Sequence, residues 1–448
     1  MILADHILIV GLGLTGQSIA NFLLKNGKKV FAIDANLENL LTKKEVQELV
    51  NYGLKVFSDD TFHLWHLIEV AVLSPGISPN NKIYKELLKL NIPVLSDIEI
   101  ALNNYYGKCI GITGTNGKTS TTLLVTHLLN EMGVTAAAVG NIGQPVINET
   151  KKLNPSKILV IELSSFQLEI MNKKSLDVGV ILNITPDHLD RYATMENYTK
   201  AKLRIAHCIK DKGSLFLNST INLKTDLSSA FHCHHFGYSN INEVYTDLDY
   251  IYVKNKKIAL PKKYQKKKCH HIENIMAACA IISTLNLEIP LLEKGLESFT
   301  LPEHRIEWVR DVEGISYYND SKATNIDAVL RAVENFKQPI RLIVGGVDKG
   351  FPYTDWIEAF KGKVVQIIAI GQAANKIKTS LEPYFKVDLA LNLEEAVKYA
   401  TRDAKNGDIV LLSPGCSSYD MFKDFADRGN EFKRIVNCID KVLTHINN

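Results

Sequence analysis

Residues 109–122 read C-I-G-I-T-G-T-N-G-K-T-S-T-T, and this stretch decides the fold expected for the chain. Its first apolar residues predict the end of a buried strand, and residues 122–129 have the apolar spacing of a helix. Between them, residues 114–117 form a glycine-rich turn. A strand, a glycine turn and a helix N-terminus make a phosphate cradle, because the backbone N–H groups converge and the helix end adds positive potential.

The two residues after this turn fit the same interpretation. Lys118 is expected on the β- and γ-phosphates of a nucleotide, and the Thr119 hydroxyl on Mg²⁺. The stretch departs from the strict Walker A pattern, since Ile112 stands where that pattern has its first glycine. A tight strand-to-helix turn with an exposed lysine remains the alternative.

A second glycine-rich turn lies near the N-terminus, where residues 6–16 read H-I-L-I-V-G-L-G-L-T-G. A buried strand leads into Gly11, Gly13 and Gly16, a helix is expected over 17–26, and a second strand over 29–33 ends at Asp34. This spacing is typical of a dinucleotide-binding βαβ unit with an acid on the ribose. Any nucleotide with a diphosphate and a ribose fits the same geometry, and the glycines could serve helix–strand packing alone.

Length and composition exclude several classes of protein. A chain of 448 residues is too long for one core, and two to four domains are expected. The hydrophobic content of 46% and the charged content of 23% are those of a globular protein. A net charge of +3 gives no support for nucleic acid as a partner, and no apolar run is long enough to span a bilayer. We therefore expect neither nucleic acid nor a membrane as a partner.

Apolar strands alternate with helices along the rest of the chain, which predicts parallel sheets. Polar residues follow the strands: S-P-G-I after 70–73, E-L-S-S-F-Q at 162–167, and T-P-D-H-L-D-R at 185–191, while a further short strand is expected at 91–94. Glu162 ends a strand near the phosphate loop and is a candidate Mg²⁺ ligand, or a buried acid satisfied by a neighbour. The basic run at 254–268 favours a solvated hairpin.

Together these stretches resemble the Mur ligases, the ATP-dependent peptide ligases of peptidoglycan assembly. The resemblance runs from end to end and is carried by G-L-G-L-T-G (11–16), L-S-P-G-I (73–77), G-I-T-G-T-N-G-K-T (111–119), G-N-I-G (140–143), E-L-S-S-F-Q-L-E (162–169), the motif around His188, A-K-L-R (201–204), E-H-R (303–305), N-D-S-K-A-T-N (319–325), G-G-V-D-K-G (345–350) and 413–433. Within the family, E-L-S-S-F-Q-L and N-D-S-K-A-T-N are most typical of the member that adds D-glutamate to UDP-N-acetylmuramoyl-L-alanine.

The resemblance implies an α/β protein of three domains. These are a Rossmann-like domain for the UDP substrate at 1–100, a central P-loop ATPase-type domain for ATP and two Mg²⁺ ions at 101–301, and a C-terminal Rossmann-like domain for the amino acid at 302–448. It also implies a cytoplasmic enzyme, which we expect to be a monomer.

The resemblance further assigns residues to the three substrates. It places ATP on Gly114, Thr115, Asn116, Gly117, Lys118, Thr119, Ser120, Asn274, Arg305 and Asp320. It places UDP-N-acetylmuramoyl-L-alanine on Leu14, Thr15, Asp34, Ser74, Pro75, Gly76, Asn141, Ser164 and His188. It places D-glutamate on Thr324, Lys349, Ser418, Tyr419 and Phe425.

Catalysis and metal binding follow from the same resemblance. Lys118, His188 and Lys202 are the implied catalytic residues, and the implied Mg²⁺ ligands are Thr119, Glu162, His188 and Lys202. Spacing alone gives Lys202 no role. A lysine amine becomes an anionic oxygen ligand only as a carbamate, so carbamylation of Lys202 by CO₂ is a hypothesis.

Some residues depart from the family pattern. Ala35 and Asn36 stand where some members have Thr-Arg, and His271 stands where an asparagine is common. Three competing interpretations remain: a folate polyglutamate ligase, an NAD-dependent oxidoreductase supported by Gly11–Asp34 alone, and a catalytically inactive nucleotide-binding protein.

Overall fold

The computed structural model describes residues 4–78, 80–103, 105–150, 154–221, 233–266, 269–285, 288–350 and 352–439. It divides into two compact units. The larger unit comprises Met1–Ile184 and Glu196–Phe299, and the smaller unit comprises Thr185–Met195 and Thr300–Asn448. The α/β fold class with parallel sheets is confirmed, while the predicted domain boundaries stay predictions.

The first sheet lies in the larger unit and has the order β3-β2-β1-β4-β5, with all strand pairs parallel. Its strands are β1 (His6–Val10), β2 (Lys29–Ile33), β3 (Lys55–Phe57), β4 (Val70–Leu73) and β5 (Val94–Ser96). Its helices are α1 (Leu14–Lys25), α2 (Leu37–Leu41), α3 (Lys44–Asn51), α4 (Lys82–Lys89) and α5 (Asp97–Leu102), with a 3₁₀ turn η1 (Trp65–Leu67). The central strands are continuous apolar runs because helices cover both faces of a parallel sheet.

Two boundaries in this sheet differ from prediction. Helix α1 begins at Leu14 rather than at residue 17, directly after the glycine turn. The strand predicted at 91–94 begins only at Val94, because Asn91 takes a positive φ of 54° and ends α4, with Ile92 N donating to Leu87 O (2.9 Å).

The second sheet, also in the larger unit, has the order β14-β13-β12-β11-β10-β9-β6-β8-β7. Its strands are β6 (Cys109–Thr113), β7 (Ala136–Gly140), β8 (Ile158–Glu162), β9 (Leu176–Ile181), β10 (Ile209–Asn218), β11 (Cys233–Gly237), β12 (Val244–Thr246), β13 (Tyr250–Val253) and β14 (Lys256–Ala259). Its helices are α6 (Lys118–Glu131), α7 (Val146–Thr150), α8 (Ser165–Ile170), α10 (Met195–Leu203), α11 (His270–Ser283) and α12 (Ile289–Ser298), with a 3₁₀ turn η2 (Arg204–Cys208). The hairpin in this region is formed by β13, which precedes the basic run 254–268, and by β14, which lies in its first part; residues 267 and 268 of the run lie outside the described residues.

The third sheet forms the smaller unit and has the order β15-β16-β20-β17-β18-β19. Its strands are β15 (Glu307–Val312), β16 (Ile315–Asn319), β17 (Ile340–Gly345), β18 (Val364–Ile370), β19 (Val387–Leu389) and β20 (Ile409–Leu412). Its helices are α9 (Leu189–Tyr192), α13 (Ile326–Glu334), α14 (Trp356–Phe360), α15 (Ala374–Leu381), α16 (Leu393–Arg402) and α17 (Phe425–Asn437), with a 3₁₀ turn η4 (Tyr353–Asp355). Only the edge pair β15–β16 is antiparallel among the described strands of this sheet.

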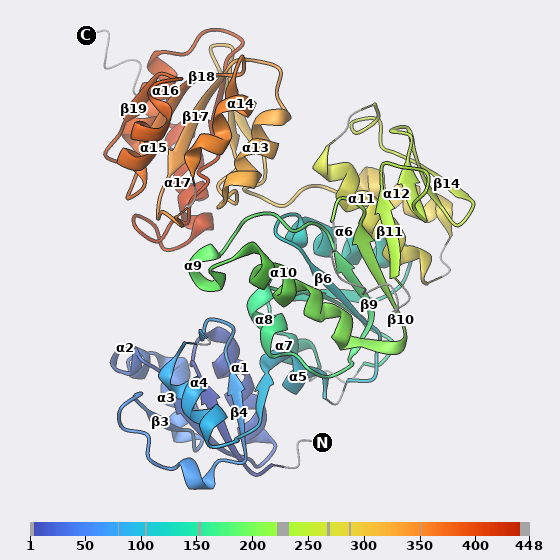
Figure 1. Ribbon diagram of the computed structural model, residues 1–448, viewed down its shortest axis with the longest axis vertical. Helices are drawn as coiled ribbons and strands as arrows, with labels where there is room; N and C mark the ends of the chain where they lie inside the picture. Colours follow the sequence, from blue (N-terminus) through green and yellow to red (C-terminus); the bar gives the residue numbers. More distant parts are fainter. Residues whose placement is uncertain are drawn as a thin grey trace. The chain divides into compact units, whose positions relative to one another are not determined.

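Helix α5 connects the first two sheets. It contacts β4 and β5 on one side and α7 on the other (Figure 1). All six of its residues are buried, and one apolar cluster continues from Ile9 and Leu23 to Leu159 of the second sheet. The two sheets of the larger unit therefore share a core.

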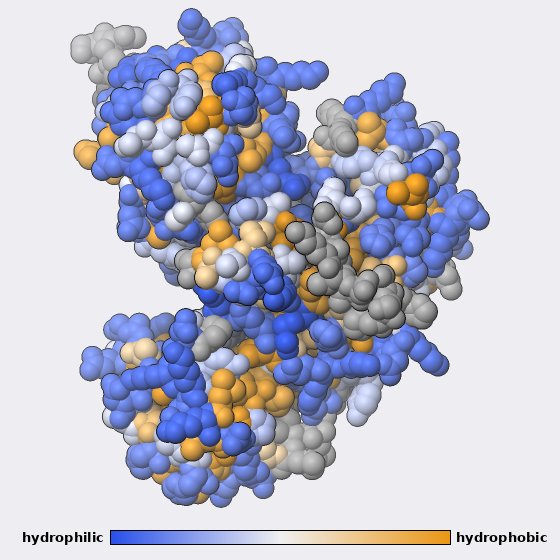
Figure 2. Space-filling model, viewed as in Figure 1, coloured by the Kyte–Doolittle hydropathy of each residue, from blue (hydrophilic) through white to orange (hydrophobic). Residues whose placement is uncertain are grey.

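The surface is that of an ordinary globular chain. On the face shown in Figure 2, hydrophobic residues form small patches between hydrophilic ones. None of the helices that the structure describes has the length and apolar character needed to cross a membrane.

Candidate active site

The predicted phosphate loop is formed between β6 and α6. Gly117 precedes the first helical residue with φ 84°, a left-handed conformation that glycine adopts without strain. Lys118 Nζ donates to the carbonyl oxygens of Gly114 (2.9 Å) and Thr115 (2.8 Å), so the ammonium lies over the loop. Thr119 and Ser120 follow in the first turn of α6, where helix N–H groups are unsatisfied.

Asn183, just beyond β9, holds the loop in shape. Its carbonyl accepts Thr115 N (3.0 Å), its Oδ1 accepts Asn116 N (2.8 Å), and its Nδ2 donates to Asn116 O (3.0 Å). The sequence analysis did not assign a role to Asn183. An asparagine directly after a buried strand was the available signal.

Lys202 lies beneath the same loop. Its side chain is only 1% exposed, and its Nζ donates to Gly114 O (2.9 Å). The amine also lies 4.6 Å from the centre of the Tyr198 ring, whose hydroxyl is 3.2 Å from Thr115 Oγ1. The lysine that spacing alone left without a role thus reaches the phosphate loop, and Tyr198 is a further loop contact that the sequence analysis missed.

Glu162 lies at the end of β8 and is 2% exposed. Its Oε1 accepts a hydrogen bond from Asn141 Nδ2 (2.9 Å), while its buried Oε2 has no hydrogen-bond partner in the described part of the chain. A buried carboxylate oxygen without a donor fits a Mg²⁺ ligand. No group of three or more His, Cys, Asp or Glu side chains that could hold a metal ion is found among the described residues.

Asn274 of α11 borders the loop from another side. It is 6% exposed, and a Cβ added at Gly117 would come within 2.5 Å of Asn274 Oδ1. The ring of His271 lies 5.7 Å from that of Tyr264 and is not part of this contact. The predicted ATP residue Asn274 is therefore next to the phosphate loop.

The N-terminal glycine turn is organised by Asp34. Its two carboxylate oxygens accept Leu12 N (2.7 Å) and Asn36 N (2.8 Å), and Ser74 Oγ donates to Gly11 O (2.7 Å). Gly16 allows this close packing, because an added Cβ would meet Gly11 O at 2.1 Å. Asp34 and Ser74 thus join the turn after β1 to the ends of β2 and β4.

His188, also predicted for the UDP substrate, lies in the smaller unit. The other residues of this set lie in the larger unit, where Asn141 contacts Glu162 and the rest lie at three places. Leu14 is 65% exposed, and Thr15 follows it in the first turn of α1. Pro75 and Gly76 follow β4. Ser164 caps α8, with its hydroxyl accepting Gln167 N (3.2 Å).

In the smaller unit, Asp320 follows β16 and is buried. Its Oδ1 accepts Ile306 N (3.2 Å) and its Oδ2 accepts Ser413 Oγ (2.8 Å). Burial raises the pKa of Asp320 to about 7, an effect that these hydrogen bonds and the nearby charge of Arg305 oppose. The two ATP residues predicted for this unit are therefore electrostatically coupled.

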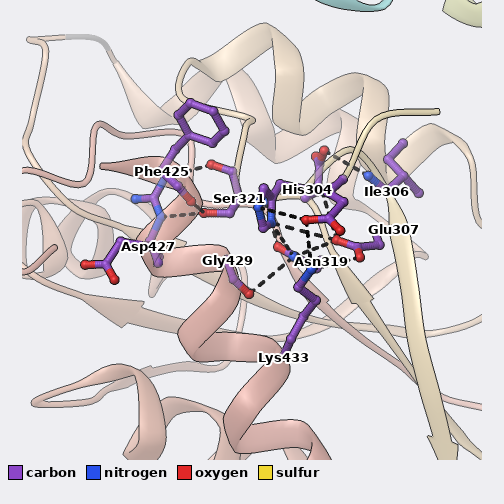
Figure 3. A network of polar contacts seen from close by, with 12 residues as sticks. His304, Ile306, Glu307, Asn319, Ser321, Phe425, Asp427, Gly429 and Lys433 are labelled. Carbon is purple, nitrogen blue, oxygen red and sulfur yellow. Dashed lines mark hydrogen bonds and ion pairs between the residues drawn. The ribbon is translucent and has the colours of Figure 1, made fainter. Parts of the chain in front are cut away.

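A polar network fixes the segment that carries Arg305 and Asp320 (Figure 3). Asn319 Nδ2 contacts His304 Nδ1 (2.9 Å), Glu307 Oε2 (3.0 Å) and Gly429 O (3.3 Å). Lys433 Nζ is 3.1 Å from Glu307 Oε1. An added Cβ at Gly429 would lie 2.3 Å from His304 Nδ1, so the network requires glycine there. The sequence analysis missed Asn319 and Glu307 as supports.

A second set of contacts in the smaller unit involves the segment around His188. Lys349 Nζ forms an ion pair with Asp187 Oδ1 (3.1 Å), and Asn325 Nδ2 donates to Asp187 Oδ2 (3.2 Å). His188 has a left-handed φ of 53°. Two stretches that the sequence analysis assigned to D-glutamate, N-D-S-K-A-T-N and G-G-V-D-K-G, are thereby joined to Asp187.

The other residues predicted for D-glutamate also lie in this unit. Thr324 is half-buried, Ser418 is 2% exposed and Tyr419 is 75% exposed. Phe425 begins α17, and Lys322 Nζ lies 3.6 Å from its ring centre.

The predicted residues thus fall into two sets. The larger unit holds the phosphate loop, Glu162, Lys202, Asn274 and the Asp34 turn, and the smaller unit holds His188, Arg305, Asp320 and the residues predicted for D-glutamate. The second metal site predicted on His188 and Lys202 draws on both units and stays a prediction.

Known protein families match all three parts of the chain. A Mur ligase MurD-like N-terminal domain matches residues 5–96, a Mur ligase middle domain matches 112–282, and a Mur ligase glutamate ligase domain matches 304–416.

Among solved structures, MurF from Acinetobacter baumannii is similar with a TM-score of 0.62 and 15% identity, covering 91% of each chain. MurC from Thermotoga maritima is similar with a TM-score of 0.59 and 16% identity, covering 96% of this chain and 99% of that one. At these sequence identities, the similarity supports the fold alone.

Curated relatives are similar over nearly their full length. The UDP-N-acetylmuramoylalanine–D-glutamate ligase of Protochlamydia amoebophila is 43% identical over 434 residues, covering 96% of this chain and 98% of that protein. The ligase of the same name from Caldanaerobacter subterraneus subsp. tengcongensis is 37% identical over 440 residues, covering 96% and 98%. With three matching domains and this coverage, the chain belongs to the Mur ligase family.

Proposed function

We propose that this protein is an ATP-dependent ligase that adds D-glutamate to UDP-N-acetylmuramoyl-L-alanine in peptidoglycan precursor synthesis. The observation that carries the proposal is the 43% identity, over 96% of the chain, to a relative named for this reaction. The arrangement of Lys118, Glu162 and Lys202 around one glycine loop supports ATP as the reactant.

The reaction needs ATP because a carboxylate is a poor electrophile at neutral pH. A carboxylate oxygen of the L-alanyl group attacks the γ-phosphorus, the bond to the β-phosphate oxygen breaks, and an acyl phosphate and ADP form. The amine of D-glutamate then attacks the acyl carbon, and inorganic phosphate leaves as the amide forms and the amine loses its proton. Charge neutralisation and alignment dominate such a reaction, because two anions meet in its first step.

Lys118 would supply positive charge at the β- and γ-phosphates, together with the N–H groups of the first turn of α6. Arg305 would add a second cation, and Asp320 and Asn274 would hold the rest of the nucleotide. The loop is already shaped by Asn183, so binding does not have to order it.

Mg²⁺ would be held by Thr119 and by the buried Oε2 of Glu162. When bound, the ion neutralises phosphate charge and aligns the phosphates. A second ion on His188 and a carbamylated Lys202 is part of the proposal. Asn141 would keep Glu162 oriented.

Carbamylation of Lys202 has its own test. Activity of the purified protein should fall when dissolved CO₂ is removed and return when bicarbonate is added, and the intact mass should include the carbamate. Full activity under CO₂ depletion, with a mass that corresponds to the bare amine, would exclude it.

For the two other substrates, the Asp34 turn with Leu14, Thr15 and the 74–76 loop would hold the UDP group. Lys349, Thr324, Ser418 and Phe425 would hold D-glutamate, and Lys349 is suited to a carboxylate because it already pairs with Asp187. We propose that the reaction takes place in the cytoplasm, because it uses ATP and cytoplasmic precursors. We also propose that the protein works as a monomer.

The deciding experiment measures phosphate release from ATP and Mg²⁺ with UDP-N-acetylmuramoyl-L-alanine, adding one amino acid at a time. Release that depends on D-glutamate, and does not occur with L-glutamate, L-alanine or a diamino acid, is expected. Release with another amino acid would move the protein to another step of the pathway. No release with any of them would overturn the proposal.

A further inference from the structure

Helix α5 carries a fully buried acid, Glu99, that bonds to both sheets of the larger unit. Its Oε2 accepts Ser96 N (3.0 Å) and Ser96 Oγ (3.1 Å), which closes a capping box at the end of the first sheet. Its Oε1 accepts the backbone N–H groups of Asn172 (2.7 Å) and Lys173 (2.8 Å), directly after α8. Four donors on two carboxylate oxygens are more than a capping box needs, and two of them belong to the second sheet's side of the unit.

Arg204 binds oxygen acceptors at the same turn, whereas Glu99 binds its N–H donors. Its Nε donates to Leu168 O (2.8 Å), and its Nη2 donates to Met171 O (3.0 Å) and to Asn172 Oδ1 (2.6 Å). The turn formed by residues 171–173, called the clamped turn below, thus gives two N–H groups to the Glu99 carboxylate and the Met171 carbonyl and the Asn172 side-chain oxygen to the Arg204 guanidinium. Charge-assisted hydrogen bonds of this kind are stronger than neutral ones.

The elements that Glu99 and Arg204 connect are close in the chain to residues of the proposed active site. Helix α8 begins three residues after Glu162 and is capped by Ser164, and Arg204 follows Lys202 by two residues. Glu99 in turn follows β5, which lies in the same sheet as the Asp34 and Ser74 loops. The clamped turn is therefore connected through Glu99 to the sheet that carries the Asp34 and Ser74 loops, and through α8 and Arg204 to the chain segments of Glu162 and Lys202.

We propose that Glu99 and Arg204 are positioning residues that set the first sheet against the second, so that the acyl end of the nucleotide substrate meets the γ-phosphate. This inference rests on the proposed function. The reacting atoms must approach to about 3–3.5 Å, and a misplacement of about 1 Å costs on the order of a hundredfold in rate. Neither residue touches a substrate under the proposal.

Glu99→Gln tests the inference with almost no change in shape. Glutamine offers one acceptor oxygen where Glu99 uses two, so its amide NH2 must face either the Ser96 N–H or the N–H groups of Asn172 and Lys173. Either orientation weakens the connection between α5 and the clamped turn. We expect kcat to fall by about tenfold to a hundredfold. The dissociation constants of UDP alone and of ADP alone should stay within about twofold, because each ligand needs only one of the two sheets.

Arg204→Met is expected to have the same effect, and the double variant should be no slower than the worse single variant, since both residues hold one turn.

Glu395→Gln is the matched control. Glu395 also lies in the first turn of a capped helix and accepts a backbone N–H, from Leu391 (2.7 Å), but α16 belongs to the smaller unit and carries none of the proposed site residues. The kcat of the Glu395→Gln variant should equal that of the wild type.

Wild-type kcat in Glu99→Gln would overturn the inference. Loss of UDP or ADP affinity in step with thermal stability would also overturn it, because that pattern marks a general structural role. If Glu99→Gln fails to fold, Arg204→Lys, which keeps the charge but has a single nitrogen in place of the guanidinium fork, must show the same separation of kcat from ligand affinity. Failure of the proposed function would show differently, as a wild type that releases no phosphate with D-glutamate.

Discussion

Asp320 has an environment that shifts its titration well away from that of a carboxyl group in water. It is enclosed with Ser413 and the Ile306 N–H, and burial raises its pKa to about 7 despite the charge of Arg305. A carboxyl group with a pKa of about 7 is half protonated at neutral pH, and it becomes a good hydrogen-bond acceptor only as the pH rises above that value. As a proposed ATP contact, it links nucleotide affinity to pH.

We therefore expect the KM for ATP to fall as pH rises from 6 to 8, by up to about tenfold if only the ionised carboxylate binds. Asp320→Asn should bind ATP more weakly at pH 8 and should lose this dependence. Initial rates at saturating nucleotide-sugar and D-glutamate, measured every half pH unit for both proteins, separate this effect from titration of ATP itself. A variant with the wild-type slope would contradict the assignment.

Among the elements, α6 shows how one glycine differs from another. Gly117 and Gly133 flank the two ends of this helix, and both have left-handed φ values, 84° and 78°. An added Cβ at Gly117 would meet Asn274 Oδ1 at 2.5 Å, whereas one at Gly133 would meet nothing within 4 Å. Both positions therefore require a left-handed backbone conformation, and they differ only in the atoms that surround the glycine.

Gly117→Ala and Gly133→Ala should each destabilise the protein by about 1 kcal/mol, because each forces alanine into a left-handed conformation. Only Gly117→Ala should also weaken ADP binding, by at least about tenfold, since it moves Asn274 or the loop. Calorimetric titration with ADP and urea unfolding of both variants measure the two effects. Equal ADP affinity in both would show that the Gly117 contact has no part in nucleotide binding.

At the scale of the whole molecule, Asp97 places a carboxyl group inside the core shared by the first two sheets. Burial raises the pKa of Asp97 to about 6 from its usual value of 3.8, opposed by the Ile98 N–H and the Gln167 side chain. The folded chain therefore binds more protons than the unfolded chain between these pH values, and stability falls as pH rises through them.

Asp97→Asn removes this charge while keeping an acceptor oxygen. The variant should be more stable than the wild type, by an amount that grows from pH 5 to about 3 kcal/mol at pH 8. Urea unfolding followed by fluorescence at several pH values gives the difference. A constant difference across this range would mean that the ionisation of Asp97 does not affect folding.

Much of this architecture follows from the sequence because it is local. The strands at 29–33 and 70–73 have the predicted bounds, and the phosphate loop lies where its glycines indicate. The contacts that support the loop are not local. Asn116 and Asn183 are 67 positions apart, and Asp187 and Lys349 are 162 apart, so no spacing rule connects them. Lys202 is similar: its helix predicts a solvated lysine, and only the fold buries it.

The bonds from Asn183 to the phosphate loop have a kinetic consequence. Because Thr115 N and Asn116 N already have acceptors, and Lys118 already rests on the loop carbonyls, the loop has its shape before any nucleotide arrives. These two amides should exchange slowly with deuterium in the free protein, and ADP should slow them little further. Nucleotide association should then be limited by encounter rather than by loop ordering, with a rate that varies inversely with solvent viscosity.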